Sequence, residues 1–203
     1  MRRIFALLMV FFVPAAQAAD APTVLVVGDS LSAGYGIDVD QSWTNLLQQR
    51  LKEQGYEHRV VNASISGDTT EGGAARLGFA LNEFSPALVV IELGGNDGLR
   101  GISPSQTQAN LERMVNDSRA AGAAVVMLGI KIPPNYGKRY IEAFEGVFPS
   151  VANSLNVPWV EFFLEGVALN DALMQDDGIH PNAEAQPKLL DNAWTVINQA
   201  LSD

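Results

Sequence analysis

The sequence predicts an α/β fold in which helices cover both faces of a five-stranded parallel sheet, giving three layers. Five short runs read as strands, and three of them are near-continuous runs of apolar residues with the composition of buried strands. Amphipathic segments with helical spacing separate these runs, so strand and helix alternate along the chain. Neither a composition change nor a linker divides residues 19–203, which we therefore expect to form a single domain.

The first predicted strand and the turn after it organise the rest of the chain. Residues 24–27 are four consecutive apolar residues, and Gly28 ends the run. Asp29 and Ser30 follow at once, where a turn into a helix would begin. Chemistry in an open α/β sheet takes place at the carboxyl ends of its strands, so Ser30 is a candidate nucleophile. A simple helix cap by Asp29 or Ser30 is the alternative.

The remaining elements follow from apolar spacing and from residues that begin or end helices. Further strands are predicted at 59–61, 87–93, 124–130 and 158–162. Helices are predicted at 40–54, 71–82, 104–121, 140–155 and 185–201. Ser103 and Pro104 suit a helix start, and Gly122 suits the end of the same helix. Pro149 is expected to bend the helix that contains it.

The first 18 residues have the pattern of a secretory signal peptide. Arg2 and Arg3 give a positive start, residues 4–13 are apolar, and a small-x-small pattern ends at Ala18. The apolar run is shorter than the ~20 residues of a membrane-spanning helix. We therefore expect cleavage after Ala18 without stable membrane insertion, and export to the periplasm, with secretion as the alternative.

Charge and cysteine content exclude several classes of function. Removal of the leader changes the formal net charge from −10 to −12, which is unsuited to binding the phosphates of nucleic acid. The absence of cysteine excludes thiol nucleophiles and Cys-ligated metal sites. Only two histidines, His58 and His180, remain as candidate bases. His58 has no serine or acid pattern around it, so we expect it to be exposed and structural.

Polar residues from distant parts of the chain are expected to meet at one edge of the sheet. Right-handed crossovers place every strand-to-helix loop there. The residues concerned are Ser30, Gly67, Asn96, Asp177 and His180. The Asp177 carboxylate can hold His180 Nδ1–H, which leaves Nε2 free to take the Ser30 proton. The N–H groups of Ser30 and Gly67 and the side-chain amide of Asn96 can then stabilise an oxyanion. Taken singly, each residue also suits an ordinary turn, cap or solvated loop.

Four sequence blocks resemble those of the GDSL, or SGNH, hydrolase family. They are Gly28-Asp29-Ser30-Leu31-Ser32, Ile65-Ser66-Gly67-Asp68-Thr69, Gly94-Gly95-Asn96-Asp97 and Asp177-Gly178-Ile179-His180-Pro181. The resemblance extends from about Thr23 to the final helix. It implies a flavodoxin-like fold, Ser30 as nucleophile, Gly67 and Asn96 as oxyanion donors, and Asp177 and His180 as the other triad members. It also implies hydrolysis of acyl esters, thioesters and lysophospholipids, with no metal or cofactor.

Apolar residues near the edge loops are candidates for binding the acyl chain of such a substrate. They are Leu31, Leu99, Ile130, Pro133 and Tyr136. Ordinary loop packing is the alternative explanation. The glycines in residues 97–101 favour a loop that moves when substrate binds.

Other functions also fit parts of the sequence. A phosphate- or flavin-binding module is disfavoured because the first loop lacks the Gly-x-x-x-x-Gly-Lys pattern. A serine protease would use the same triad, but amides have poorer leaving groups than esters. A carbohydrate O-deacetylase is compatible with the same fold. Ser32 stands where the Gly-x-Ser-x-Gly pattern of ordinary α/β-hydrolases has its second glycine, which argues against that fold. We expect a monomer.

Overall fold

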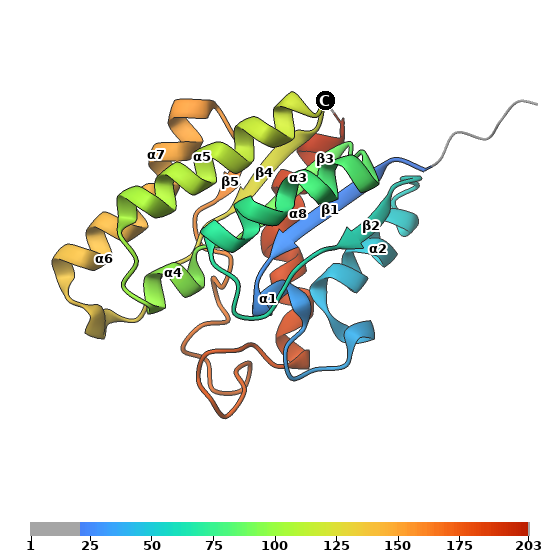
Figure 1. Cartoon of the computed structure of the whole chain (residues 1–203). Coiled ribbons are helices and arrows are strands. Elements are labelled where there is room, and N and C mark those ends of the chain that lie inside the picture. Colours follow the sequence, from blue (N-terminus) through green and yellow to red (C-terminus); the bar gives the residue numbers. More distant parts are fainter. Residues whose placement is uncertain (1–20, 203) are drawn as a thin grey trace, which may run out of the picture.

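The computed structural model describes residues 21–202 and contains a five-stranded, fully parallel sheet (Figure 1). The predicted leader, residues 1–18, lies outside this range. The strands are β1 (Thr23–Gly28), β2 (Arg59–Asn62), β3 (Leu88–Glu92), β4 (Ala124–Leu128) and β5 (Trp159–Val160). Their order is β2-β1-β3-β4-β5, and every neighbouring pair is parallel. This is the flavodoxin-like order, which confirms the predicted fold class.

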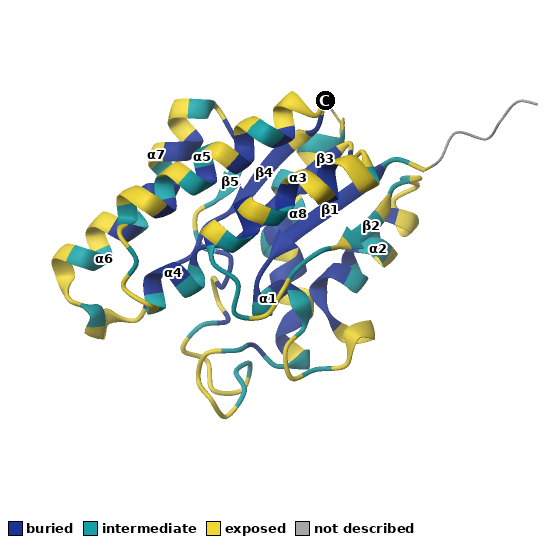
Figure 2. Cartoon of the chain, in the orientation of Figure 1, coloured by how far each residue is buried: buried dark blue, intermediate teal, exposed yellow. Residues whose placement is uncertain are grey.

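Burial of the strands explains their composition. Every residue of β1 and β3 is buried, as are all residues of β4 after Ala124. Helices cover both faces of these central strands, so each strand is a near-continuous apolar run. The edge strands β2 and β5 are only partly buried (Figure 2).

Eight α-helices and three short 3-10 turns connect the strands of the described chain. The helices are α1 (Ser30–Ala33), α2 (Trp43–Glu53), α3 (Thr70–Phe84), α4 (Gly95–Leu99), α5 (Pro104–Ala120), α6 (Lys138–Glu145), α7 (Val147–Leu155) and α8 (Gln186–Ser202). The 3-10 turns are Val39–Gln41, Pro134–Tyr136 and Ala183–Ala185. On one face α5 packs between α3 and α7, and on the other α2 packs against α8 (Figure 1).

The segment predicted as one bent helix, 140–155, is two helices. The prediction that Pro149 bends a continuous helix is wrong, because α6 ends at Glu145 and α7 begins at Val147. Pro149 has no N–H to donate to the carbonyl of Glu145, so the helical ladder breaks one turn before the proline, at Gly146. Phe144 and Phe148 on either side of the break are both buried, and their rings make an edge contact.

The core lies between the sheet and the two helical layers. Its largest fully buried side chains include Trp43 from α2, Phe144, Phe148 and Phe163. Trp43 meets Phe163 edge-on, with ring centroids 5.3 Å apart. Among residues 21–202, no helix combines the length and apolar character needed to cross a bilayer.

Candidate active site

The turn after β1 presents Ser30 at the carboxyl edge of the sheet. Asp29 caps α1, since its carboxylate accepts the N–H of Leu31 at 3.0 Å, and Ser30 is the first helical residue. A side chain at Gly28 would meet Glu92 Oε2 and Ser32 Oγ at 2.7 Å. Only glycine therefore lets the end of β1 lie this close to β3 and α1. Ser30 is partly exposed, while Asp29 is buried.

Ser30, His180 and Asp177 form a continuous hydrogen-bonded chain. His180 Nε2 lies 2.9 Å from Ser30 Oγ, and His180 Nδ1 lies 2.6 Å from Asp177 Oδ2. The second Asp177 oxygen accepts the backbone N–H groups of Ile179 and His180 at 2.9 and 3.0 Å. The hydrogen bond from the His180 side chain, followed by those from the two backbone groups, lowers the pKa of Asp177 to about 2. Asp177 is therefore an anion that holds the imidazole with Nε2 toward Ser30.

Contacts around His180 restrict the orientation of its ring. The Tyr35 ring packs on the imidazole with centroids 4.5 Å apart. Gln175 holds the loop, because its backbone N–H donates to the His180 carbonyl at 2.8 Å. The Gln175 side-chain amide donates to the carbonyls of Tyr35 and Pro181 at 2.7 and 2.9 Å. These bonds connect the loop after β1 to the loop that carries His180.

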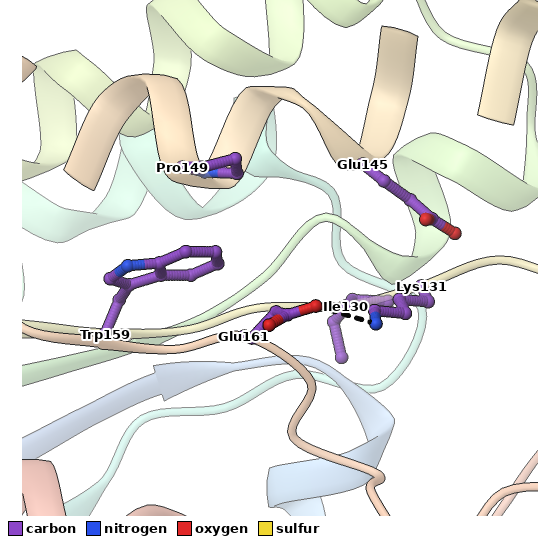
Figure 3. A pocket seen from close by; sticks show the side chains of 6 residues that line it. All are labelled: Ile130, Lys131, Glu145, Pro149, Trp159 and Glu161. Carbon is purple, nitrogen blue, oxygen red and sulfur yellow. Dashed lines mark hydrogen bonds and ion pairs between the residues drawn. The ribbon is translucent and has the colours of Figure 1, made fainter. Parts of the chain in front are cut away.

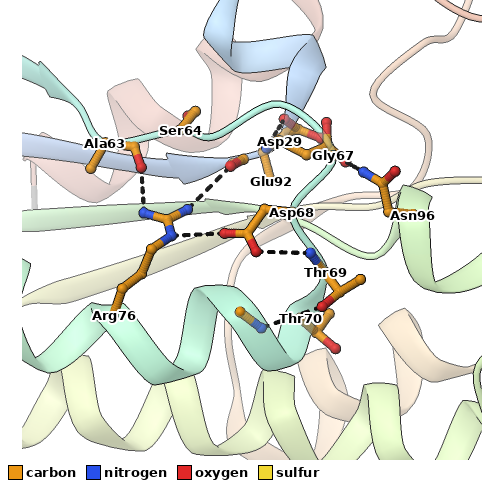
Figure 4. Close-up of polar contacts among 12 residues, drawn as sticks. Asp29, Ala63, Ser64, Gly67, Asp68, Thr69, Thr70, Arg76, Glu92 and Asn96 are labelled. Carbon is orange, nitrogen blue, oxygen red and sulfur yellow. Dashed lines mark hydrogen bonds and ion pairs between the residues drawn. The ribbon is translucent and has the colours of Figure 1, made fainter.

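The predicted oxyanion donors lie on the two loops beside Ser30. Gly67 follows β2 and has a φ of +79°, a conformation that favours glycine. Asn96 lies in α4 after β3, and its Nδ2 donates to Asp29 Oδ2 at 3.1 Å (Figure 4). The Arg100 guanidinium donates to the Gly67 carbonyl at 2.8 Å and links the two loops. β1 and β3 flank the point where the strand order reverses, which is where open α/β sheets bind ligands.

The five residues predicted to bind the acyl chain do not line one common groove beside Ser30. Leu31 lines a shallow depression together with Ser30 and His180. The Tyr136 hydroxyl donates to the Leu99 carbonyl at 3.0 Å, so these two residues are in contact. Pro133 is exposed. Of the five predicted residues, only Leu31 shares a depression with the serine.

Ile130 lines a separate pocket of about 250 Å³ beside the edge strand (Figure 3). The other residues of this pocket are Lys131, Glu145, Pro149, Trp159 and Glu161. The Lys131 ammonium pairs with Glu161 at 3.0 Å inside it. Neither Ser30 nor His180 lines this pocket.

The contacts of Arg76 form a polar network near the end of β1 that was not predicted from the sequence. Arg76 of α3 pairs with Asp68 at 2.7 Å and also donates to the carbonyls of Ala63 and Gly28, the latter at 3.3 Å (Figure 4). Its guanidinium thereby connects α3, the end of β1 and the loop that carries Gly67. The sequence held no signal for this role, because an arginine in an amphipathic helix is ordinarily a solvated residue.

Two buried carboxyl groups lie side by side in this network. Glu92 is fully buried at the end of β3, and its Oε2 accepts the Ser32 hydroxyl at 2.6 Å. Burial, then the charge of Asp29, raises the pKa of Glu92 well above its ordinary value. Burial also raises the pKa of Asp29, to about 6. An acid inside the apolar run 87–93 was the available sequence signal for this pair.

His58 lies just before β2, away from this chain of hydrogen bonds. It is partly buried, not exposed as expected, because its ring packs edge-on against Tyr56 at 5.8 Å. Burial lowers its pKa. Within the described residues, no group of three or more His, Asp or Glu side chains is placed to hold a metal ion.

Comparison with known proteins shows that this chain is similar to acyl-ester hydrolases. Residues 26–186 match the GDSL-like Lipase/Acylhydrolase family. Esterase TesA of Pseudomonas aeruginosa is 58% identical over 185 residues, which cover 91% of this chain and 92% of that protein. Thioesterase 1/protease 1/lysophospholipase L1 of Escherichia coli K12 is 47% identical over 86% of this chain and 83% of its own length. A crystal structure of TesA superposes with a TM-score of 0.86 at 58% identity, covering 88% of this chain and 99% of that one.

Proposed function

Since this chain belongs to the GDSL-like lipase/acylhydrolase family, whose relatives here hydrolyse esters and thioesters, we propose that Ser30, His180 and Asp177 carry out its reaction. The observation that supports this assignment is the hydrogen-bonded chain itself. Ser30 Oγ lies 2.9 Å from His180 Nε2, and His180 Nδ1 lies 2.6 Å from Asp177. An unassisted serine hydroxyl is a weak nucleophile, and this arrangement supplies the base it needs.

The first half of the reaction forms an acyl-enzyme. Ser30 Oγ attacks the carbonyl carbon of the ester or thioester while His180 Nε2 takes its proton. Asp177 stabilises the resulting imidazolium. The carbonyl oxygen becomes an oxyanion and accepts hydrogen bonds from the N–H groups of Ser30 and Gly67 and from the Asn96 amide. When the tetrahedral intermediate collapses, the alcohol or thiol leaves with the proton from His180.

The second half returns the enzyme to its starting state. A water molecule attacks the acyl carbon of the Ser30 ester while His180 takes one of the water protons. The oxyanion forms again in the same hole and collapses. Ser30 leaves with the proton from His180, and the free carboxylic acid departs. Loss of one oxyanion donor typically lowers kcat by about 10²- to 10³-fold.

Ser30→Ala and His180→Ala test this assignment. The wild type and both variants are assayed on p-nitrophenyl esters from short to long acyl chains, and on an acyl thioester with a thiol-reactive dye. We expect both variants to lose turnover on every substrate while keeping the wild-type thermal unfolding curve. A folded Ser30→Ala or His180→Ala variant with wild-type kcat would show that the reaction takes place elsewhere. A wild-type optimum of chain length would support an acyl groove beside Leu31.

The natural substrates are proposed to be lysophospholipids or other esters outside the cytoplasm. This follows from the predicted signal peptide, since an exported enzyme does not meet cytoplasmic acyl thioesters. The E. coli relative is named for protease activity as well. Ester hydrolysis is favoured over peptide hydrolysis because alcohols and thiols are better leaving groups than amines. We propose that residues 19–203 act as one monomeric domain.

A further inference from the structure

Asp29 makes a contact that a helix cap does not require. Its side chain is 2% exposed, and both carboxylate oxygens are occupied. Oδ1 accepts the Leu31 N–H at 3.0 Å, which is the cap of α1. Oδ2 accepts Asn96 Nδ2 at 3.1 Å (Figure 4). Ser, Thr or Asn would cap the helix equally well without placing a charge in the interior. The contact of Asp29 Oδ2 with Asn96 therefore explains why this position holds an aspartate.

We propose that Asp29 is a positioning residue that orients the side-chain amide of Asn96 as an oxyanion donor. The proposal rests on the function proposed above for Asn96. An asparagine amide has two N–H groups, and here one of them donates to Asp29. The other is left for the substrate oxyanion. A flipped amide would place Asn96 Oδ1 against the carboxylate, where two acceptors repel each other. The carboxylate thus selects the amide orientation before substrate arrives.

Hydrogen bonds of the Asp29 backbone and of Ser32 hold the turn that carries Asp29. The Asp29 backbone N–H points at Glu92 Oε2 at 3.4 Å, and the Ser32 hydroxyl donates to the same oxygen at 2.6 Å. Trp43 Nε1 donates in turn to Ser32 Oγ at 3.2 Å. This chain of bonds ties the turn after β1 to the buried end of β3.

Gly95, which precedes Asn96, allows α4 to approach the carboxylate. A side chain at position 95 would lie 3.3 Å from Asp29 Oδ2, closer than an ordinary contact. Burial and the charge of Asp29 raise the pKa of Glu92 well above its ordinary value, and this direction favours the negative charge of the carboxyl pair on Asp29. Asp29 can therefore act as the charged acceptor that the Asn96 amide faces.

Asp29→Asn separates capping from positioning. An asparagine at 29 keeps the shape of the side chain and an oxygen for the Leu31 N–H. It presents an N–H group to Asn96 in place of the charged acceptor. We expect kcat on a short p-nitrophenyl ester to fall by about 10- to 100-fold, with little change in KM. We expect a thermal unfolding temperature no lower than that of the wild type. Asp38→Asn, the same change at an exposed position, is the matched control with unaltered kcat.

A double-mutant cycle with Asn96→Ala decides whether Asp29 acts through Asn96. If it does, Asp29→Asn costs little in the Asn96→Ala background, because the donor it orients is already absent. An equal fold-loss in both backgrounds would overturn the proposal, and so would a wild-type kcat for Asp29→Asn. If Asn96→Ala alone kept the wild-type kcat, the oxyanion role of Asn96 would fail, and the role of Asp29 would fail with it. Ser30→Ala tests the nucleophile alone, so its outcome distinguishes a failure of the proposed function from a failure of the role proposed for Asp29.

Discussion

Asp177 lies at the surface, yet its pKa is below the ordinary value of an aspartate. Its carboxylate is 39% exposed and accepts three hydrogen bonds, two of them from the backbone. Those bonds favour the charged form and lower its pKa to about 2, the bond from the His180 side chain contributing most. The carboxylate therefore stays ionised across the whole pH range in which an esterase is assayed.

The first prediction concerns Asp177→Asn. The asparagine amide can donate to His180 Nδ1, which favours the tautomer with the proton on Nε2, where it cannot accept the Ser30 proton. We expect kcat to fall by at least about 100-fold on a p-nitrophenyl ester. Because the side chain is exposed, thermal stability should change little. Steady-state kinetics with a thermal melt measure both, and a variant with wild-type kcat would argue against a role for Asp177 in orienting His180.

The second prediction concerns Asp29, whose pKa is raised while that of Asp177 is lowered. Burial raises its pKa from 3.8 to about 6, so between these values the folded chain binds more protons than the unfolded chain. The free energy of unfolding therefore decreases as the pH rises through this window. Asp29→Asn removes this dependence. We expect the variant to be more stable than the wild type at pH 7 and to lose that advantage as the pH falls toward about 4.

Urea unfolding at a series of pH values measures this difference. The Asp38→Asn control should follow the wild-type curve, since that carboxyl is exposed. A variant of Asp29 that is less stable than the wild type at neutral pH would show that the buried charge stabilises the fold. A positioning role predicts greater stability together with slower turnover, and a purely structural role does not combine the two.

The residues proposed to touch substrate were easier to predict from sequence than the residues that hold them in place. Ser30, Asn96 and His180 each stand in a short block whose order along the chain is informative. The contact between Asp29 and Asn96 joins residues 67 positions apart, and neither position shows it alone. Periodicity reports which face of an element is buried, but it does not report which polar atoms meet across that face.

Among the elements, the loops showed the largest departures from expectation. Residues 95–99 belong to no helix predicted from the sequence, and they form the short helix α4. Two distant tyrosines hold this region, since the Tyr136 hydroxyl donates to the carbonyl of Leu99 at the end of α4 and the Tyr140 hydroxyl donates to that of Ile102, just after it, at 2.9 Å. Strands and long helices were predicted well because their apolar spacing repeats over many residues. A five-residue helix rich in glycine has no such repeat.

The third prediction concerns the connection between α3 and the Gly67 loop. Arg76 contacts Asp68, Ala63 and Gly28 at once through its planar guanidinium. Lysine carries the same charge as a single ammonium and does not reproduce that fork. We expect Arg76→Lys to lower the free energy of unfolding by about 1–3 kcal/mol, since its side chain is mostly buried. Chemical denaturation gives this value.

Turnover should also fall in Arg76→Lys, because the loop that carries the Gly67 donor is less well held. Arg113→Lys, at an exposed i,i+4 pair on α5, is a matched control expected to change neither stability nor kcat. If both variants kept the wild-type free energy of unfolding and the wild-type kcat, the contacts of the Arg76 guanidinium would contribute to neither stability nor turnover.

At the scale of the whole molecule, strand order places the site. The alternation of strands and helices predicts a parallel sheet, but alternation alone permits several strand orders. The order β2-β1-β3-β4-β5 was expected only through the resemblance to a known family, and it puts the ends of β1 and β3 side by side. Asp29 and Asn96 are brought together by this adjacency. Their pairing is therefore a property of the topology, which local patterns do not encode.

The fourth prediction concerns the predicted leader, residues 1–18, which lies outside the described residues. A positive start, a short apolar run and Ala18 in a small-x-small pattern suit recognition and cleavage by a signal peptidase. We expect the full sequence, expressed in a Gram-negative host, to yield a periplasmic protein that begins at Ala19. Intact mass and N-terminal sequencing of the periplasmic fraction measure this. A chain of residues 19–203 made in the cytoplasm should show the same kcat and melting temperature, because the core of the described residues is one cluster that extends from Val24 to Ile197. Recovery of an uncleaved chain in the cytoplasm would contradict export, and an inactive 19–203 chain would contradict the single-domain assignment.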